Sequence, residues 1–149
     1  MNSVMRVRAQ AAQAGAAGAA LLAVGITIGA FGAHVLKARL SVELLATLQT
    51  AVHYQLFNAL GLLALGGWLR SAAAPGAAAP GVAASTSEPL ASGIWWAARL
   101  VFAGTLLFAG SLYLLVAGAP RWLGAVTPFG GVAMIAGWLL AARALWRNR

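Results

Sequence analysis

The chain has 149 residues, of which 62% are hydrophobic and 8% are charged. Soluble domains carry about 25% charged residues, so this composition excludes an ordinary water-exposed surface and indicates a membrane protein. Ten Lys or Arg residues stand against two acidic residues. These basic residues are dispersed between long uncharged stretches instead of being gathered with aromatic residues, so we expect no nucleic-acid partner.

Four stretches contain no acidic or basic residue over about the length of 20 helical residues that crosses a bilayer core. They are Ala9–Leu36, Leu44–Leu69, Leu100–Pro120 and Trp122–Ala142. No stretch shows the alternation with period two that is typical of barrel strands. The sequence therefore predicts an all-α fold, a single membrane domain over residues 1–149 with four transmembrane helices at about 9–36, 44–69, 94–118 and 123–146.

The segments between these helices carry their own signals. Residues 71–92 are rich in Ala, Pro, Gly and Ser and have no apolar periodicity, which predicts a flexible cytoplasmic loop. Ser41 is expected to cap the second helix, with Glu43 in its first turn. Thr127 and Pro128 suit the opening of the fourth helix, and the alternative is a kink at Pro128 inside the span.

The basic residues also predict the orientation, because Lys and Arg are concentrated in cytoplasmic loops. With the N-terminus inside, seven basic residues lie on the cytoplasmic side and three on the other side. The first group is Arg6, Arg8, Arg70, Arg99, Arg143, Arg147 and Arg149, and the second is Lys37, Arg39 and Arg121. We therefore expect both chain ends in the cytoplasm.

Small residues spaced four apart allow helices in lipid to approach closely. One such stripe is present in the first predicted helix and one in the fourth. The first consists of Gly25, Gly29 and Ala33, and the second of Ala133, Gly137 and Ala141. We expect both stripes to pack against neighbouring helices.

Polar residues interrupt the second predicted helix, where each one costs free energy to insert into a membrane. Gln49 and His53 are four apart and share one face, whereas Gln55 and Asn58 are three apart and share another. Two polar faces predict two neighbouring helices. Hydrogen bonding between helices is one explanation, and a polar conduit or ligand pocket is the other.

The residues do not assemble an enzyme or cofactor site. His34 and His53 are the two histidines, and His53 lies about nine residues into its helix, hence roughly 13 Å deeper than His34. One haem or metal ion therefore cannot reach both without a re-entrant loop. Glu43 and Glu88 are the two carboxylates, and they make no acid–base pair. The absence of cysteine excludes thiolate chemistry. We expect no catalytic site, no metal and no cofactor.

Several sequence blocks resemble one family. The blocks are Gly29–His34 (GAFGAH), Thr50–Gln55 (TAVHYQ), Leu107–Tyr113 (LFAGSLY), Val126–Gly131 (VTPFGG) and Ala136–Trp138 (AGW). Together they are similar to domain-of-unknown-function family 423, small bacterial inner-membrane proteins similar to eukaryotic transmembrane protein 256. The resemblance covers about residues 25–147. It implies a compact multi-pass protein of the bacterial inner membrane and supplies no established activity.

The resemblance also selects polar positions that we expect to face the interior. With the polar residues of the second helix they form a candidate polar cluster of His34, His53, Tyr54, Gln55, Asn58, Ser111, Tyr113 and Thr127. The family usually has histidine where this chain has Asn58, and an amide does not titrate, which weakens a proton-transfer role for this position.

Three functions remain open at this stage. The first is a structural or accessory membrane component that binds a partner or lipid, as a homo-oligomer or in a larger membrane complex. The second is an oligomeric transporter or channel for a small solute or ion, since four short helices enclose little space alone. The third is a haem-containing oxidoreductase subunit, which only the two histidines favour.

Overall fold

A computed structural model describes residues 2–74 and 84–147, including their side chains except those of residues 84–89. Four long α-helices and two short 3-10 helices are present, and these described residues form no strand. The long helices are α1 (Ser3–His34), α2 (Val42–Ala72), α3 (Ala84–Val116) and α4 (Thr127–Trp146), and the short ones are η1 (Leu36–Ala38) and η2 (Arg121–Ala125). The predicted all-α fold is confirmed over this part of the chain.

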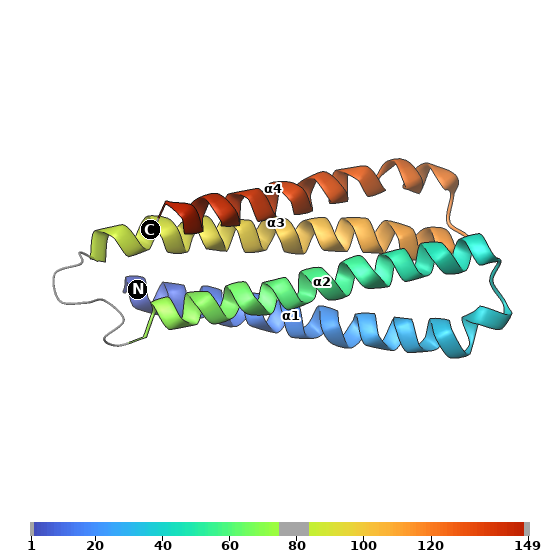
Figure 1. Ribbon diagram of the computed structural model, residues 1–149, viewed down its shortest axis with the longest axis horizontal. Helices are drawn as coiled ribbons and strands as arrows, with labels where there is room; N and C mark the ends of the chain where they lie inside the picture. Colours follow the sequence, from blue (N-terminus) through green and yellow to red (C-terminus); the bar gives the residue numbers. More distant parts are fainter. Residues whose placement is uncertain (1, 75–83, 148–149) are drawn as a thin grey trace.

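The long helices form two antiparallel hairpins that lie side by side (Figure 1). α1 packs along α2, α3 packs along α4, and the hairpins meet chiefly where α2 packs on α3. The start of α1, the end of α2, the start of α3 and the end of α4 lie at one end of the bundle, called here the terminal end. The opposite end, which carries η1 and η2, is called the loop end.

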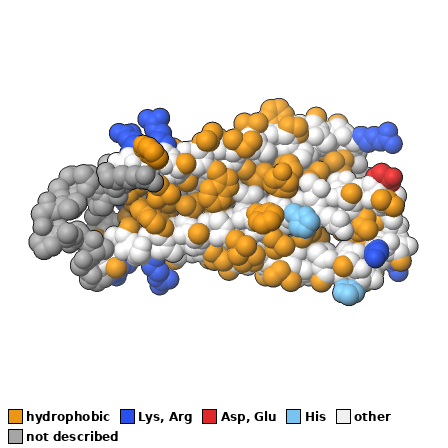
Figure 2. Space-filling view, in the orientation of Figure 1, with side chains coloured by type: hydrophobic (Ala, Val, Ile, Leu, Met, Phe, Trp, Pro, Cys, Tyr) orange, Lys and Arg blue, Asp and Glu red, His pale blue; other side chains and the backbone are white. Residues whose placement is uncertain are grey.

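Three segments are long and apolar enough to cross a membrane: Ser3–His34, Leu90–Val116 and Arg121–Trp146. α2 has 31 residues but is not among them. Its hydropathy is lowered by four polar residues, Gln49, His53, Gln55 and Asn58. On the face shown in Figure 2, hydrophobic side chains cover the middle of the bundle, and the Lys and Arg side chains lie towards its two ends.

Three predicted boundaries are corrected. α1 begins at Ser3 instead of residue 9, because the Asn2 side chain accepts a hydrogen bond from the Val4 amide and starts the helix before the apolar stretch. α2 runs to Ala72 and α3 begins at Ala84, so residues 84–92 are helical and do not belong to a flexible loop. Leu90 and Ala91 are buried in the core, which holds this part of α3 against the bundle. The centre of the predicted loop, residues 75–83, lies outside the described residues.

The helix starts near the loop end follow local capping rules. Ser41 caps α2 by accepting a hydrogen bond from the Leu44 amide, as predicted. Backbone and Ser41 hydrogen bonds hold the pKa of the exposed Glu43 carboxyl below its usual value. Pro128 lies in the first turn of α4 and does not kink the span. Thr127 is the first residue of α4, and its side chain makes no capping hydrogen bond.

The first small-residue stripe is partly confirmed. Gly25 and Gly29 face α2, where an added Cβ atom would lie 2.9 and 3.2 Å from side chains. Ala33 is exposed, and Gly32 is buried in its place. At 3.6 residues per turn, position 32 lies about 20° around the helix from position 25, whereas position 33 lies about 80° away.

The second stripe places α4 against α3. Gly137 and Ala141 are buried, and Ala133 is half-buried. The sequence stripe omits another close approach between these helices, at Gly104 and Gly130. A Cβ atom on Gly104 would lie 2.8 Å from the carbonyl oxygen of Gly130. The α3–α4 contact therefore depends on two facing glycines, in the way expected for close packing in lipid.

Candidate functional site

Gln55 connects three helices from the middle of α2. Its side chain is 2% exposed. The amide nitrogen Nε2 donates a hydrogen bond to the Leu21 carbonyl oxygen on α1 at 2.8 Å, and the amide oxygen Oε1 accepts one from the Tyr113 hydroxyl on α3 at 2.9 Å. Gln55 therefore ties both helix hairpins together, so α2 contacts two neighbours here through only one of its two predicted polar faces.

Asn58, one turn further along α2, connects α2 to α4. Its amide nitrogen donates hydrogen bonds to the Tyr54 carbonyl oxygen at 2.8 Å and to the Met134 sulfur at 3.2 Å. Its side-chain oxygen accepts a hydrogen bond from the Trp138 indole nitrogen at 2.8 Å. Both the nitrogen and the oxygen of the Asn58 amide are thus hydrogen-bonded, and the amide contacts Met134 and Trp138, which are one turn apart on α4.

A third connection joins α3 to the start of α4. The hydroxyl oxygens of Ser111 and Thr127 lie 2.8 Å apart and share a hydrogen bond. The Ser111 hydroxyl also donates a hydrogen bond to the Phe108 carbonyl oxygen at 2.9 Å within α3. Val126 occupies the N-cap position of α4, so Thr127 lies inside the helix, where its hydroxyl contacts the neighbouring helix α3.

The structure does not bring the remaining predicted residues into the interior. His34 and His53 are exposed, and so is Gln49, which shares the outer face of α2 with His53. Tyr54 is 50% exposed, and its ring packs against Phe108 with centroids 4.9 Å apart. The polar pattern of α2 therefore divides: the Gln55–Asn58 face is buried, whereas the Gln49–His53 face is on the outside.

Sequence reasoning missed Trp138 and Met134 as partners of Asn58. Their signal was present in the spacing, because residues four apart share a helix face. Trp138 also belongs to one of the family-like blocks. Among the candidates, Gln55, Asn58, Ser111, Tyr113 and Thr127 remain, and with Trp138 and Met134 they form what we call the polar bridges.

The chemistry available to the polar bridges is limited. They consist of amides, hydroxyls, an indole and a thioether, none of which changes charge near neutral pH. In the described part of the chain, every buried side-chain nitrogen and oxygen has a hydrogen-bond partner. The described residues contain no group of three or more His, Asp or Glu that could hold a metal ion. This arrangement is suited to connecting helices.

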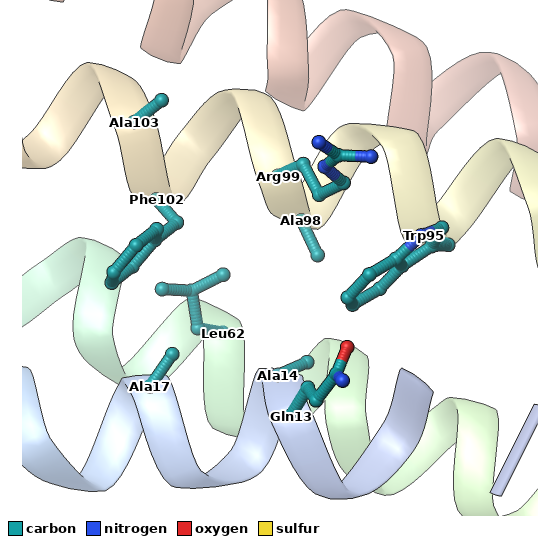
Figure 3. A pocket seen from close by; sticks show the side chains of 9 residues that line it. All are labelled: Gln13, Ala14, Ala17, Leu62, Trp95, Ala98, Arg99, Phe102 and Ala103. Atoms are coloured by element: carbon teal, nitrogen blue, oxygen red, sulfur yellow. The ribbon is translucent and has the colours of Figure 1, made fainter. Parts of the chain in front are cut away.

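Two grooves open between the helices. One, of about 450 Å³, lies between α2, α3 and α4 beside Asn58, and aromatic residues dominate its lining: Tyr54, Phe57, Phe108 and Trp138. The other, of about 510 Å³, lies between α1, α2 and α3 in the half of the bundle nearer the terminal end (Figure 3). We call the second one the α1–α3 groove.

Comparison with protein families assigns the chain to a family. A family model described as "Protein of unknown function (DUF423)" matches residues 28–131. The chain belongs to this family. The match confirms the resemblance found in the sequence blocks, and it includes every polar bridge on α2 and α3. In this family member, Met134 and Trp138 lie just beyond the matched residues.

The relatives of this DUF423 protein are named as membrane proteins. The chain is 37% identical over 123 residues to UPF0382 membrane protein SH2409 of Staphylococcus haemolyticus, covering 83% of this chain and 86% of the relative. It is 39% identical to UPF0382 membrane protein YwdK of Bacillus subtilis over 123 residues, with 81% and 84% covered. It is 33% identical to UPF0382 inner membrane protein YgdD of Escherichia coli over 115 residues, with 77% and 75% covered.

No solved structure matches the chain significantly. With three segments able to span a bilayer and relatives that are named membrane proteins, this DUF423 protein is a helical membrane protein.

Proposed function

We propose that this protein is a structural or accessory component of the bacterial inner membrane that binds a partner or lipid through the outer faces of its bundle. In this proposal all four helices span the bilayer and both chain ends are cytoplasmic. Escherichia coli YgdD, which is named an inner membrane protein, supports the location.

The bundle geometry supports the topology. α2 is as long as the three apolar helices and runs antiparallel beside α1 and α3 (Figure 1). Its two buried polar side chains, Gln55 and Asn58, are hydrogen-bonded to neighbouring helices, which lowers the cost of placing α2 in a bilayer. Among the described residues, six basic residues lie towards the terminal end and three at the loop end. This bias favours a cytoplasmic terminal end.

The observation that carries the proposal is that the buried polar side chains form hydrogen bonds between helices. Gln55, Asn58 and Ser111 each bond to another helix. Large apolar side chains such as Phe129, Ile135 and Leu139 are exposed instead. A bundle with polar groups turned inwards and paired, and an apolar outer surface, is suited to contact lipid or another membrane protein.

Transport by an oligomer is the second candidate. The groove beside Asn58 favours it, because an adjoining subunit could enclose that space. It is ranked second because both ends of the Asn58 amide are already engaged by Tyr54, Met134 and Trp138.

Native mass spectrometry of the protein extracted in mild detergent tests the proposal. An accessory component is expected to retain a partner protein or lipid in fixed stoichiometry. A bare symmetric oligomer would contradict it and support the transport candidate, which solute flux into liposomes containing the protein would then measure.

A further inference from the structure

The α1–α3 groove has a deep apolar floor and is open to one side of the bundle. Leu62 of α2, which is 1% exposed, forms the floor. Ala14 and Ala17 line the α1 side, and Phe102 lines the α3 side. Because these alanines are small, α1 and α3 leave a space of about 510 Å³ between them, within the range of roughly 300–1,000 Å³ that is typical of small-molecule sites.

Gln13, Trp95 and Arg99 lie at one end of this apolar space. In Figure 3, Gln13 points from α1 towards α3, and Trp95 points from α3 towards α1. Arg99 follows Trp95 by one turn, and its guanidinium lies 4.6 Å from the ring centroid of the exposed Trp96. Phe102 and Ala17 lie towards the other end of the groove. The groove therefore has a polar mouth and an apolar interior.

The polar mouth has unused binding capacity. In the described part of the chain, no carboxylate pairs with Arg99, and the Gln13 amide makes no hydrogen bond. Arg99 lies inside the apolar segment Leu90–Val116, where a charged side chain is costly unless a counter-charge or water reaches it. In Figure 3 the Arg99 guanidinium is turned away from α1 and Gln13, so an anion at the groove mouth would receive donors from both side chains once Arg99 turns towards it.

The surrounding charge favours a negatively charged occupant. Arg8 and Arg70 line a separate depression at the same end of the bundle. Arg6, Arg143 and Arg147 are also towards this end, where Glu88, near the start of α3, is the acidic residue; Glu43 is at the loop end. Arginine and tryptophan at this depth are typical of the zone in which a bilayer changes from hydrocarbon to headgroups.

We propose that the α1–α3 groove binds one anionic phospholipid. An acyl chain lies against Leu62, Ala17 and Phe102, and the phosphate lies at the mouth, within reach of the Arg99 guanidinium and the Gln13 amide. Arg99 can extend from its apolar position towards the headgroup zone, as long basic side chains do near helix ends. This inference rests on the proposed function and names the lipid class that the accessory protein would hold.

Lipid titration of the full-length protein tests this site. The delipidated protein in detergent is titrated with dioleoyl phosphatidylglycerol or dioleoyl phosphatidylcholine, and native mass spectrometry measures the dissociation constant of the first lipid. We expect the anionic lipid to bind about tenfold more tightly, and Arg99→Gln to remove this preference, because one charged hydrogen bond corresponds to about a tenfold change or more.

Three further variants separate the groove from general surface charge. Arg121→Gln removes the same charge at an exposed position on η2 at the loop end, and it should leave the preference intact. Ala103→Leu, at an exposed groove position, should weaken binding of both lipids by filling the apolar space. Circular dichroism and thermal unfolding establish that each variant folds, and Arg99→Lys, which retains the charge, should retain part of the preference.

Several results would overturn the lipid site. They are equal affinity for the two lipids, an unchanged preference in Arg99→Gln, or an equal loss in Arg121→Gln. If the protein is a dimer, and Ala103→Leu dissociates the dimer but leaves lipid binding unchanged, the groove would be assigned to a second copy of the chain. These results can be distinguished from failure of the proposed function. If the protein retains a partner but shows no lipid preference, the groove assignment is wrong and the proposed function still stands.

Discussion

The indole nitrogen of Trp138 on α4 lies 2.8 Å from the side-chain oxygen of Asn58 on α2, and it donates a hydrogen bond across the helix interface. One turn earlier on α4, the Met134 sulfur accepts from the nitrogen of the same amide. One side chain of α2 thus sets both the rotation and the axial position of α4. Because α4 otherwise packs mainly on α3, this contact connects α4 directly to α2, which belongs to the other hairpin.

Trp138→Phe should destabilise the bundle by about 1 kcal/mol. The substitution keeps an aromatic ring but removes the N–H donor, and it leaves the Asn58 oxygen without its partner. Reversible unfolding in mixed micelles, followed by circular dichroism, measures the change. Trp122→Phe is the matched control, since Trp122 is 66% exposed. Equal losses in the two variants would show that the Asn58 contact contributes nothing specific.

Gly104→Ala should destabilise the α3–α4 hairpin by about 1–3 kcal/mol through overpacking. An added Cβ atom would lie 2.8 Å from backbone atoms of Gly130 and Met134, which cannot move as a flexible side chain can. Gly110→Ala is the control on the same helix, where an added Cβ atom meets no atom within 4 Å. That variant should be neutral or gain up to about 1 kcal/mol from helix propensity.

If Gly104→Ala proves as stable as Gly110→Ala in the same unfolding assay, the close approach of α3 and α4 at Gly104 and Gly130 would be contradicted.

Single cysteines can test the four-span topology, because the chain has no cysteine of its own. Ala38→Cys and Ala117→Cys lie at the loop end and should react with a membrane-impermeant maleimide in intact spheroplasts. Ala74→Cys, just after α2, should react only after permeabilisation. The native positions are exposed. Labelling of positions 38 and 74 from the same side would mean that α2 does not cross the bilayer.

Much of the local structure was predictable from the sequence. Ser41 and Pro128 act within one helical turn, so their positions at helix starts follow from neighbouring residues. The apolar stretches predicted the helices, although not their ends, since Asn2 starts α1 in a polar segment. Family membership also followed from blocks of residues and is confirmed by the family match.

The contacts between helices were harder to predict from the sequence. The polar residues predicted that both polar faces of α2 would meet neighbouring helices, but only the face with Gln55 and Asn58 is buried, and the face with His53 is exposed. Which face is buried depends on how α2 is rotated towards α1 and α3. Ala33 was predicted to pack and is exposed for the same reason: a stripe spaced by four drifts around a helix of 3.6 residues per turn.

The central claim is that the buried polar residues of α2 bond helices together, and a double-mutant cycle on Gln55 and Tyr113 tests it most directly. The free energies of unfolding of Gln55→Leu, Tyr113→Phe and the double variant are measured in mixed micelles. The 2.9 Å hydrogen bond between these side chains predicts a favourable coupling of about 0.6 kcal/mol, the average for such pairs between membrane helices. Additive effects, with Gln55→Leu alone more stable than the wild type, would contradict the claim and indicate that Gln55 is kept for another purpose.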